Sequence, residues 1–91
     1  MIDVMKNKRG LIIGVANDHS IAWGIAEACA RAGADLAFTY QNDAVYKRVA
    51  PLAERVGGSW LEPCDVSKDE DLDRVFERAK KEWGRLDFVI H

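Results

Sequence analysis

Short apolar runs alternate along the chain with longer stretches in which apolar residues recur every three or four positions. A contiguous apolar run is typical of a buried strand, whereas the helical spacing is typical of an amphipathic helix. The pattern predicts strands at residues 10–15, 35–40, 59–64 and 86–91. It predicts helices at residues 20–32, 43–56 and 67–83, each followed by a glycine that ends it.

Single residues mark the ends and faces of these helices. Ser67, with a glutamate three residues later, has the capping-box pattern and is expected to begin the third helix. Ser20 and Asp43 are candidate caps of the first two helices. Pro51 is expected to kink the second helix or to separate its first turns. Gly24 is expected to let the first helix pack tightly on the sheet.

The order β-α-β-α-β-α-β predicts an α/β fold. Each connection is long enough for a helix, so right-handed crossovers make the sheet parallel and place helices on both of its faces. The expected strand order is 3-2-1-4, which is a doubly wound arrangement. A ligand is then expected at the carboxyl ends of the strands, at the switch point between the first and fourth strands.

The turn after the first strand has small residues where a phosphate-binding loop needs them. Gly14 permits a sharp exit from the strand, and Ala16 lets the main chain approach a phosphate. Ser20 offers its hydroxyl, and the amides of Ser20 and Ile21 begin a helix, where an anion is favoured. The spacing differs from the usual G-x-G-x-x-G. The alternative is an ordinary strand-to-helix loop with a capping serine.

The end of the second strand bears on the choice of nucleotide. An acidic residue there is typical of NAD binding, and a basic residue is typical of NADP binding. This chain has the neutral Gln41, followed by Asp43, and no Lys or Arg before Lys47. A 2′-phosphate would have no nearby positive partner, which favours NADH over NADPH. The alternative is a polar turn without a ligand.

Residues at the ends of the last two strands complete the candidate site. Asp65 is placed to accept a hydrogen bond from an adenine amino group, and the Val66 amide to donate to the ring; alternatively, Asp65 is a turn residue. His91 is expected to form a wall of the site. Tyr40 and Lys47 have the Tyr-x6-Lys spacing of some reductases. They lie on the adenosine side of the inferred crevice, so a catalytic role is not expected.

Composition narrows the class of protein. The net charge of −2 favours neither nucleic acid nor an anionic membrane as partner. The apolar runs are far shorter than a membrane span, and the first nine residues do not have the pattern of a secretory signal. Cys29 and Cys64 are expected to be reduced, buried thiols. No metal site is expected, because a zinc site needs more ligands than His19, His91 and the two cysteines supply together.

Taken in order, these residues resemble the type I enoyl-acyl-carrier-protein reductases, a divergent branch of the short-chain dehydrogenase/reductase superfamily. The first turn is the specific element, because ordinary members of the superfamily have T-G-x-x-x-G-I-G there. The matching segments span the chain from the first turn to its last residue, at residues 14–16, 20–22, 24–26, 37–41, 64–66 and 86–91.

The resemblance implies a Rossmann-type fold and reduction of the 2,3 double bond of enoyl-acyl carrier protein with NADH, in bacterial fatty-acid biosynthesis. It places Gly14, Ser20 and Ile21 at the pyrophosphate, and Asp65 and Val66 at the adenine. The full set of expected cofactor-binding residues is Gly14, Ala16, Ser20, Ile21, Gln41, Asp65, Val66 and His91.

The resemblance also implies that residues 1–91 are the amino-terminal part of a single dinucleotide-binding domain. The tyrosine and lysine that act in the family lie further along the chain, so no catalytic residue is expected here, and the 91 residues alone are expected to be inactive. The complete relatives are cytoplasmic homotetramers. The alternatives are a free-standing nucleotide-binding or regulatory module without catalysis, and a reductase of another substrate.

Overall fold

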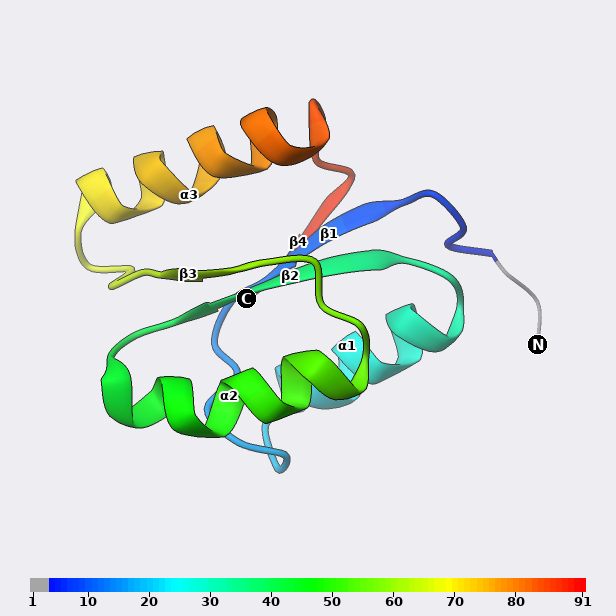
Figure 1. Cartoon of the computed structure of the whole chain (residues 1–91), viewed down its shortest axis with the longest axis horizontal. Helices are drawn as coiled ribbons and strands as arrows, with labels where there is room; N and C mark the ends of the chain where they lie inside the picture. The colour runs from blue at the N-terminus through cyan, green and yellow to red at the C-terminus, as the bar shows by residue number, and fades with distance from the viewer. Residues whose placement is uncertain (1–3) are drawn as a thin grey trace.

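A four-stranded parallel sheet lies at the centre of the molecule (Figure 1) in the computed structural model, which describes residues 4–91. The strands are β1 (Arg9–Ile12), β2 (Asp35–Tyr40), β3 (Leu61–Pro63) and β4 (Phe88–Ile90). Their order in the sheet is β3-β2-β1-β4, and each neighbouring pair is parallel. The predicted α/β fold and its 3-2-1-4 order are therefore confirmed.

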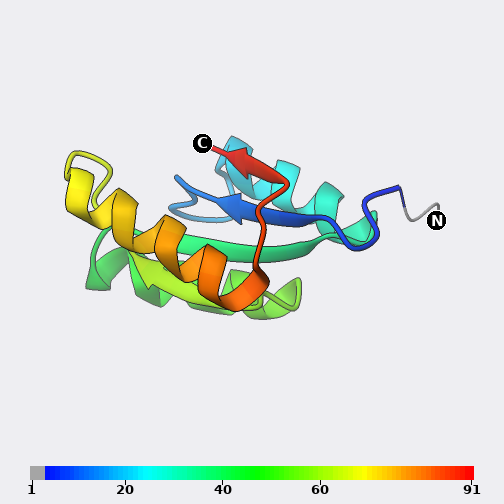
Figure 2. The same cartoon turned by 90° about the horizontal axis from the view of Figure 1, so that it is seen from above.

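Helices cover both faces of this sheet. They are α1 (Ile21–Arg31), α2 (Asp43–Arg55) and α3 (Asp69–Trp83). Helices α1 and α2 lie on one face and α3 lies on the other, as the two views of the chain show (Figures 1 and 2). The molecule thus has three layers, which is the arrangement that right-handed crossovers between parallel strands produce.

Two apolar clusters hold the layers together. Alternate residues of a strand point to opposite faces of the sheet, and helices cover both faces of β1 and β2, so Leu11, Ile12 and the run from Leu36 to Phe38 are all apolar and buried. The cluster beneath α1 and α2 contains Ile12, Leu36, Phe38, Trp23 and Val49. The cluster beneath α3 contains Leu11, Ile13, Ala37, Trp60, Val75 and Ala79.

The outer strands are shorter than the sequence predicts. The third strand was expected at residues 59–64 and the fourth at 86–91, but each has three paired residues. The apolar runs extend beyond the strands because Trp60 is buried, and Leu86 partly buried, in the cluster beneath α3. The Trp60 carbonyl still accepts a hydrogen bond from the Phe38 N–H of β2 at 3.1 Å. Hydrophobicity therefore reports burial here, and burial extends beyond the residues assigned to the strands.

For two of the three helices, the capping residue differs from the predicted one. Asn42, and not Asp43, caps α2, because its Oδ1 accepts a hydrogen bond from the Val45 N–H at 3.0 Å. The capping residue of α3 is Lys68, whose side chain makes no cap bond. Ser67 does not form the expected capping box, because it lies one residue before the capping position. Its hydroxyl donates to an Asp65 carboxylate oxygen at 2.6 Å.

The expectation for Gly24 is wrong, and Pro51 does not separate the first turns of α2. Gly24 is exposed, and a Cβ there would have no neighbour within 4 Å among the described residues, so it does not bring α1 closer to the sheet. The buried face of α1 is formed by Ala22, Trp23 and Ala26, and Gly24 lies outside it. Helix α2 runs through Pro51 without a break.

Asp87 joins the beginnings of β4 and β1. Its Oδ2 accepts hydrogen bonds from the Arg9 N–H at 2.7 Å and from Arg85 Nε at 3.2 Å. The hydrogen bond from the Arg9 N–H is the main cause of a lowered pKa of the Asp87 carboxyl, and the bond from Arg85 lowers this pKa further. A carboxyl whose pKa is lower in the folded state stabilises the fold above its unfolded pKa, and this contribution is lost as the pH falls through the folded value.

We therefore expect Asp87→Asn to make the free energy of unfolding fall less steeply on acidification below about pH 4. Urea denaturation at a series of pH values measures this slope. Asp73→Asn, at an exposed position of α3, is the matched control. Curves for wild type and Asp87→Asn that stay parallel through the acid range would contradict the prediction.

Candidate functional site

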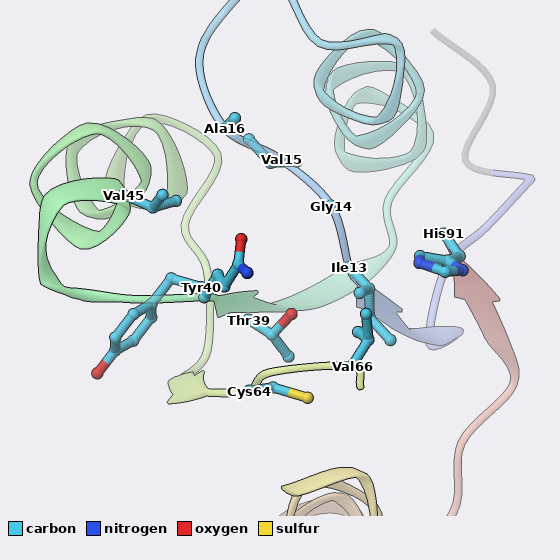
Figure 3. Close-up of a pocket in the computed structure, with 11 residues that line it drawn as sticks. Ile13, Gly14, Val15, Ala16, Thr39, Tyr40, Val45, Cys64, Val66 and His91 are labelled. Carbon is cyan, nitrogen blue, oxygen red and sulfur yellow. The ribbon is translucent and has the colours of Figure 1, made fainter. Parts of the chain in front are cut away.

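A cavity of about 160 Å³ lies at the carboxyl ends of the strands (Figure 3), where the topology predicts a ligand. Its walls come from the segments that follow each of the four strands, together with the start of α2. The lining residues are Ile13, Gly14, Val15, Ala16, Thr39, Tyr40, Gln41, Val45, Cys64, Val66 and His91. The cavity is smaller than the roughly 300–1,000 Å³ of complete ligand sites, so it has room for a small ligand or for one part of a larger one.

The lining is mainly apolar, with a few polar groups at its edge. Ile13, Val15, Val45 and Val66 contribute aliphatic side chains from different segments. Thr39 is the polar exception within a buried strand, at 2% exposure, and it also lines the cavity. Aliphatic walls with isolated hydrogen-bonding groups suit a flat aromatic ring that has polar atoms at its rim.

Gly14 forms the turn that opens the cavity. The last bond before it joins the Ile13 N–H to the Ile90 carbonyl at 2.7 Å, which keeps the chain paired with β4 up to this point. Gly14 then has φ +91°, a conformation that residues with a Cβ rarely adopt. The sequence-based expectation of a sharp exit from the first strand at this residue is confirmed.

Ser20 holds the loop between β1 and α1 in shape. Its Oγ accepts hydrogen bonds from the Ala16 N–H at 3.1 Å and from the Asn17 N–H at 3.3 Å. Ser20 occupies the capping position of α1, but its side chain makes no cap bond, and its own N–H donates to the Asn17 carbonyl at 3.2 Å. The hydroxyl therefore organises the loop backbone and does not cap the helix.

The structure brings most of the predicted binding residues to one place. Those that line the cavity are Gly14, Ala16, Gln41, Val66 and His91. Ser20 and Ile21 lie outside it, at the point where the loop enters α1, and the Ile21 side chain is 84% exposed. Asp65 also lies outside the lining, directly before Val66.

The Asp65 side chain takes part in a local turn. Its Oδ1 accepts hydrogen bonds from the Ser67 hydroxyl at 2.6 Å and from the Ser67 N–H at 3.0 Å. These two bonds lower the pKa of the Asp65 carboxyl. Asp65 therefore acts as a turn residue through its Oδ1, which was the alternative prediction for it. The neighbouring Val66 lines the cavity.

Sequence reasoning did not select Thr39, Tyr40, Val45 or Cys64 as site residues. A threonine at the end of an apolar run is the available signal for Thr39. Burial raises the pKa of the Cys64 thiol, and the expected burial of this cysteine is confirmed, whereas Cys29 is only partly buried. The Tyr40 phenol points away from the cavity (Figure 3), and its ring packs edge-on against Tyr46, with a distance of 4.8 Å between ring centres.

Residues 4–91 contain neither a metal-ligand cluster nor a membrane-spanning helix. No group of three or more His, Cys, Asp or Glu side chains in this range is placed to hold a metal ion. Within the same range, every helix is too short or too polar to cross a membrane.

Comparison with known proteins gives a consistent result. The family model described as enoyl-(acyl carrier protein) reductase matches residues 14–91. The chain is 56% identical over 91 residues to enoyl-(acyl-carrier-protein) reductase (NADH) 2 of Rhizobium meliloti, covering 100% of the chain and 34% of that protein. It is 44% identical over 88 residues to the corresponding reductase of Aquifex aeolicus, covering 97% and 33%. The chain thus spans about a third of the length of these curated relatives.

Solved structures agree with these relatives. The reductase of Anaplasma phagocytophilum, crystallised in complex with NAD, has a TM-score of 0.91 and 53% identity, covering 96% of this chain and 33% of that one. FabI of Candidatus Liberibacter asiaticus has a TM-score of 0.96 and 54% identity, covering 100% and 35%. At this identity, the likeness covers sequence as well as fold.

The two bonds to Ser20 predict the effect of removing its hydroxyl. In Ser20→Ala, the Ala16 and Asn17 amides lose their acceptor, so we expect faster hydrogen exchange at both amides. We also expect the free energy of unfolding to fall by roughly 1 kcal/mol. Residue-resolved exchange by NMR and denaturation curves measure these effects. Ser59→Ala, at an exposed position, is the control. Unchanged protection of both amides would contradict the assigned role.

Proposed function

The chain belongs to the enoyl-(acyl carrier protein) reductase family, and on this premise we propose that it is the cofactor-binding part of an NADH-dependent enoyl-acyl-carrier-protein reductase. The complete enzyme reduces the 2,3 double bond of enoyl-acyl carrier protein in bacterial fatty-acid biosynthesis. Residues 1–91 form the amino-terminal part of a single dinucleotide-binding domain. The observation that carries the proposal is the apolar cavity at the strand ends, bounded by the Gly14 turn and by Gln41.

The cofactor-binding residues in this proposal surround that cavity or lie directly beside it. Its size and its aliphatic lining fit the adenine ring of the dinucleotide, which supplies the hydride in the reaction. No catalytic residue is assigned within these 91 residues, whose part is to bind and orient the cofactor. The proposed binding residues are Gly14, Ala16, Ser20, Ile21, Gln41, Asp65, Val66 and His91.

Charge at the end of β2 supports NADH as the cofactor. Gln41 lines the cavity and is exposed, and the carboxylate of Asp43 follows within two residues. A 2′-phosphate on the adenosine ribose would meet a neutral amide and a negative neighbour at this point. The phosphate would then lose its hydration without gaining a cationic partner, which costs affinity.

Gln41→Arg tests this assignment. We expect the affinity for NADPH to rise by roughly tenfold relative to that for NADH, because a guanidinium forms charge-assisted hydrogen bonds with a phosphate. Fluorescence titration of both reduced cofactors gives the two dissociation constants. Gln41→Met, similar in length but uncharged, is the control and should bring no such gain. A wild-type protein that binds NADPH more tightly than NADH would contradict the proposal.

The reaction itself is tested with the protein that carries this chain. We expect NADH to be consumed only when an enoyl thioester on acyl carrier protein is present, with a saturated acyl-acyl carrier protein as product, identified by mass spectrometry. Saturable NADH binding without consumption of the thioester would instead identify a nucleotide-binding module that does not catalyse. A crotonyl ester that lacks the carrier protein is the control for recognition of the carrier.

We further propose that the complete protein is a cytoplasmic homotetramer. The support for this assembly and location is the resemblance of the motifs at 14–26 and 64–66 to the family. Light scattering of the preparation used for the assay gives the mass of the assembly. A fully active preparation with the mass of a monomer would show that activity does not require a tetramer, and would contradict the proposal.

A further inference from the structure

Asp71 on α3 reaches the segment that connects β3 to this helix. Its Oδ2 accepts a hydrogen bond from the Asp65 N–H at 2.8 Å, and its Oδ1 accepts one from Arg74 Nη1 at 3.1 Å. Both oxygens of the carboxylate are thus engaged, and the side chain is 18% exposed. Asp71 does not line the cavity, so it contacts the site through the backbone of Asp65.

Arg74 fixes the position of this carboxylate relative to the sheet. Its Nε lies 3.0 Å from Glu62 Oε2, and its Nη2 donates to the Pro63 carbonyl at 2.5 Å. Glu62 is 14% exposed and is also bonded to Arg78 Nη1 at 2.8 Å. A continuous series of polar contacts therefore runs from β3 to α3 and back to the backbone at Asp65.

The segment from Asp65 to Lys68 needs such a connection to be oriented. The Cys64 N–H still bonds the Tyr40 carbonyl at 2.8 Å, but the chain leaves the sheet at the next residue. The bonds between Asp65 and Ser67 and between the Lys68 N–H and the Asp65 carbonyl lie within the turn. They fix the shape of the turn but not its orientation toward the cavity.

Val66 is the residue whose placement depends on that orientation. It lies within the turn, lines the cavity and is 45% exposed. A change in the direction of the Asp65 N–H would rotate the turn and move the Val66 side chain and backbone relative to Cys64 and Ile13, which line the same cavity. The bond to Asp71 opposes this rotation, because it ties the first residue of the turn to a packed helix.

We propose that Asp71 is a positioning residue for the adenosine part of the cofactor, acting through the hydrogen bond that it accepts from the Asp65 backbone, with Arg74 holding its carboxylate in place. The inference rests on the proposed function of this cavity. Asp71 makes the binding surface of the Asp65–Val66 segment rigid before the cofactor arrives, so its loss affects cofactor affinity and leaves the chemical step unchanged.

Asp71→Ala tests the proposal in the protein that carries this chain. We expect the KM for NADH to rise roughly tenfold, as for the loss of a hydrogen bond to a charged group, while kcat changes by less than about twofold. Asp71→Asn retains an oxygen that can accept from the Asp65 N–H and should restore part of the affinity. Asp73→Ala, two residues along the same helix and exposed, is the matched control and should leave both constants unchanged.

ADP serves as the probe of the adenosine part. If Asp71 positions that part of the site, the inhibition constant of ADP rises in Asp71→Ala by the same factor as the KM for NADH. A fall in kcat and thermal midpoint with unchanged ADP inhibition would show a merely structural role and overturn the proposal. Unchanged NADH and ADP constants in Asp71→Ala would also overturn it while leaving the proposed function intact. Failure of the wild-type protein to bind NADH would overturn both.

Discussion

The parallel pairing of β1 on both of its edges is the constraint on which the rest of the structure depends. Leu11 and Ile12 are fully buried, and the strand pairs with β2 on one side and β4 on the other. Since all pairings are parallel, every strand ends at the same edge of the sheet. Segments that are far apart in sequence, at Gly14 and His91 for example, are thereby brought to one cavity.

Polar side chains beside the cavity mainly hold backbone in place. Ser20 accepts from two amides of the first loop, and Asp65 and Asp71 shape and orient the turn after β3. The surface of the cavity is therefore largely aliphatic side chains on loops whose conformation is fixed by hydrogen bonds. A site of this kind combines a rigid scaffold with loops that are preorganised for a ligand.

The sequence predicts the order of elements well, because the periodicity of apolar residues and the glycines after the helices are local signals. It also predicts five residues of the cavity, since parallel topology determines where strand ends lie. It fails where the outcome depends on the conformation of a short turn. Ser67 has the pattern of a cap, but α3 begins one residue later than that pattern predicts, and the Ser67 hydroxyl bonds Asp65 within the turn. Thr39 was missed because the sequence alone does not show that this polar residue is buried.

Helix α3 shows why stability and binding are difficult to separate in this fold. Its apolar residues Val75 and Ala79 pack on the sheet, and Asp71 lies one turn before Val75 on the same stripe of the helix. Arg74 lies on the adjoining stripe; Asp71 contacts the turn after β3, and Arg74 contacts β3 itself. Residues three and four apart share a helix face. The rotation of α3 that buries Val75 and Ala79 therefore also directs the Asp71 carboxylate toward the turn after β3. Packing of the core thus determines where the Asp71 carboxylate meets the Asp65 N–H, and the geometry of the cavity follows from that packing.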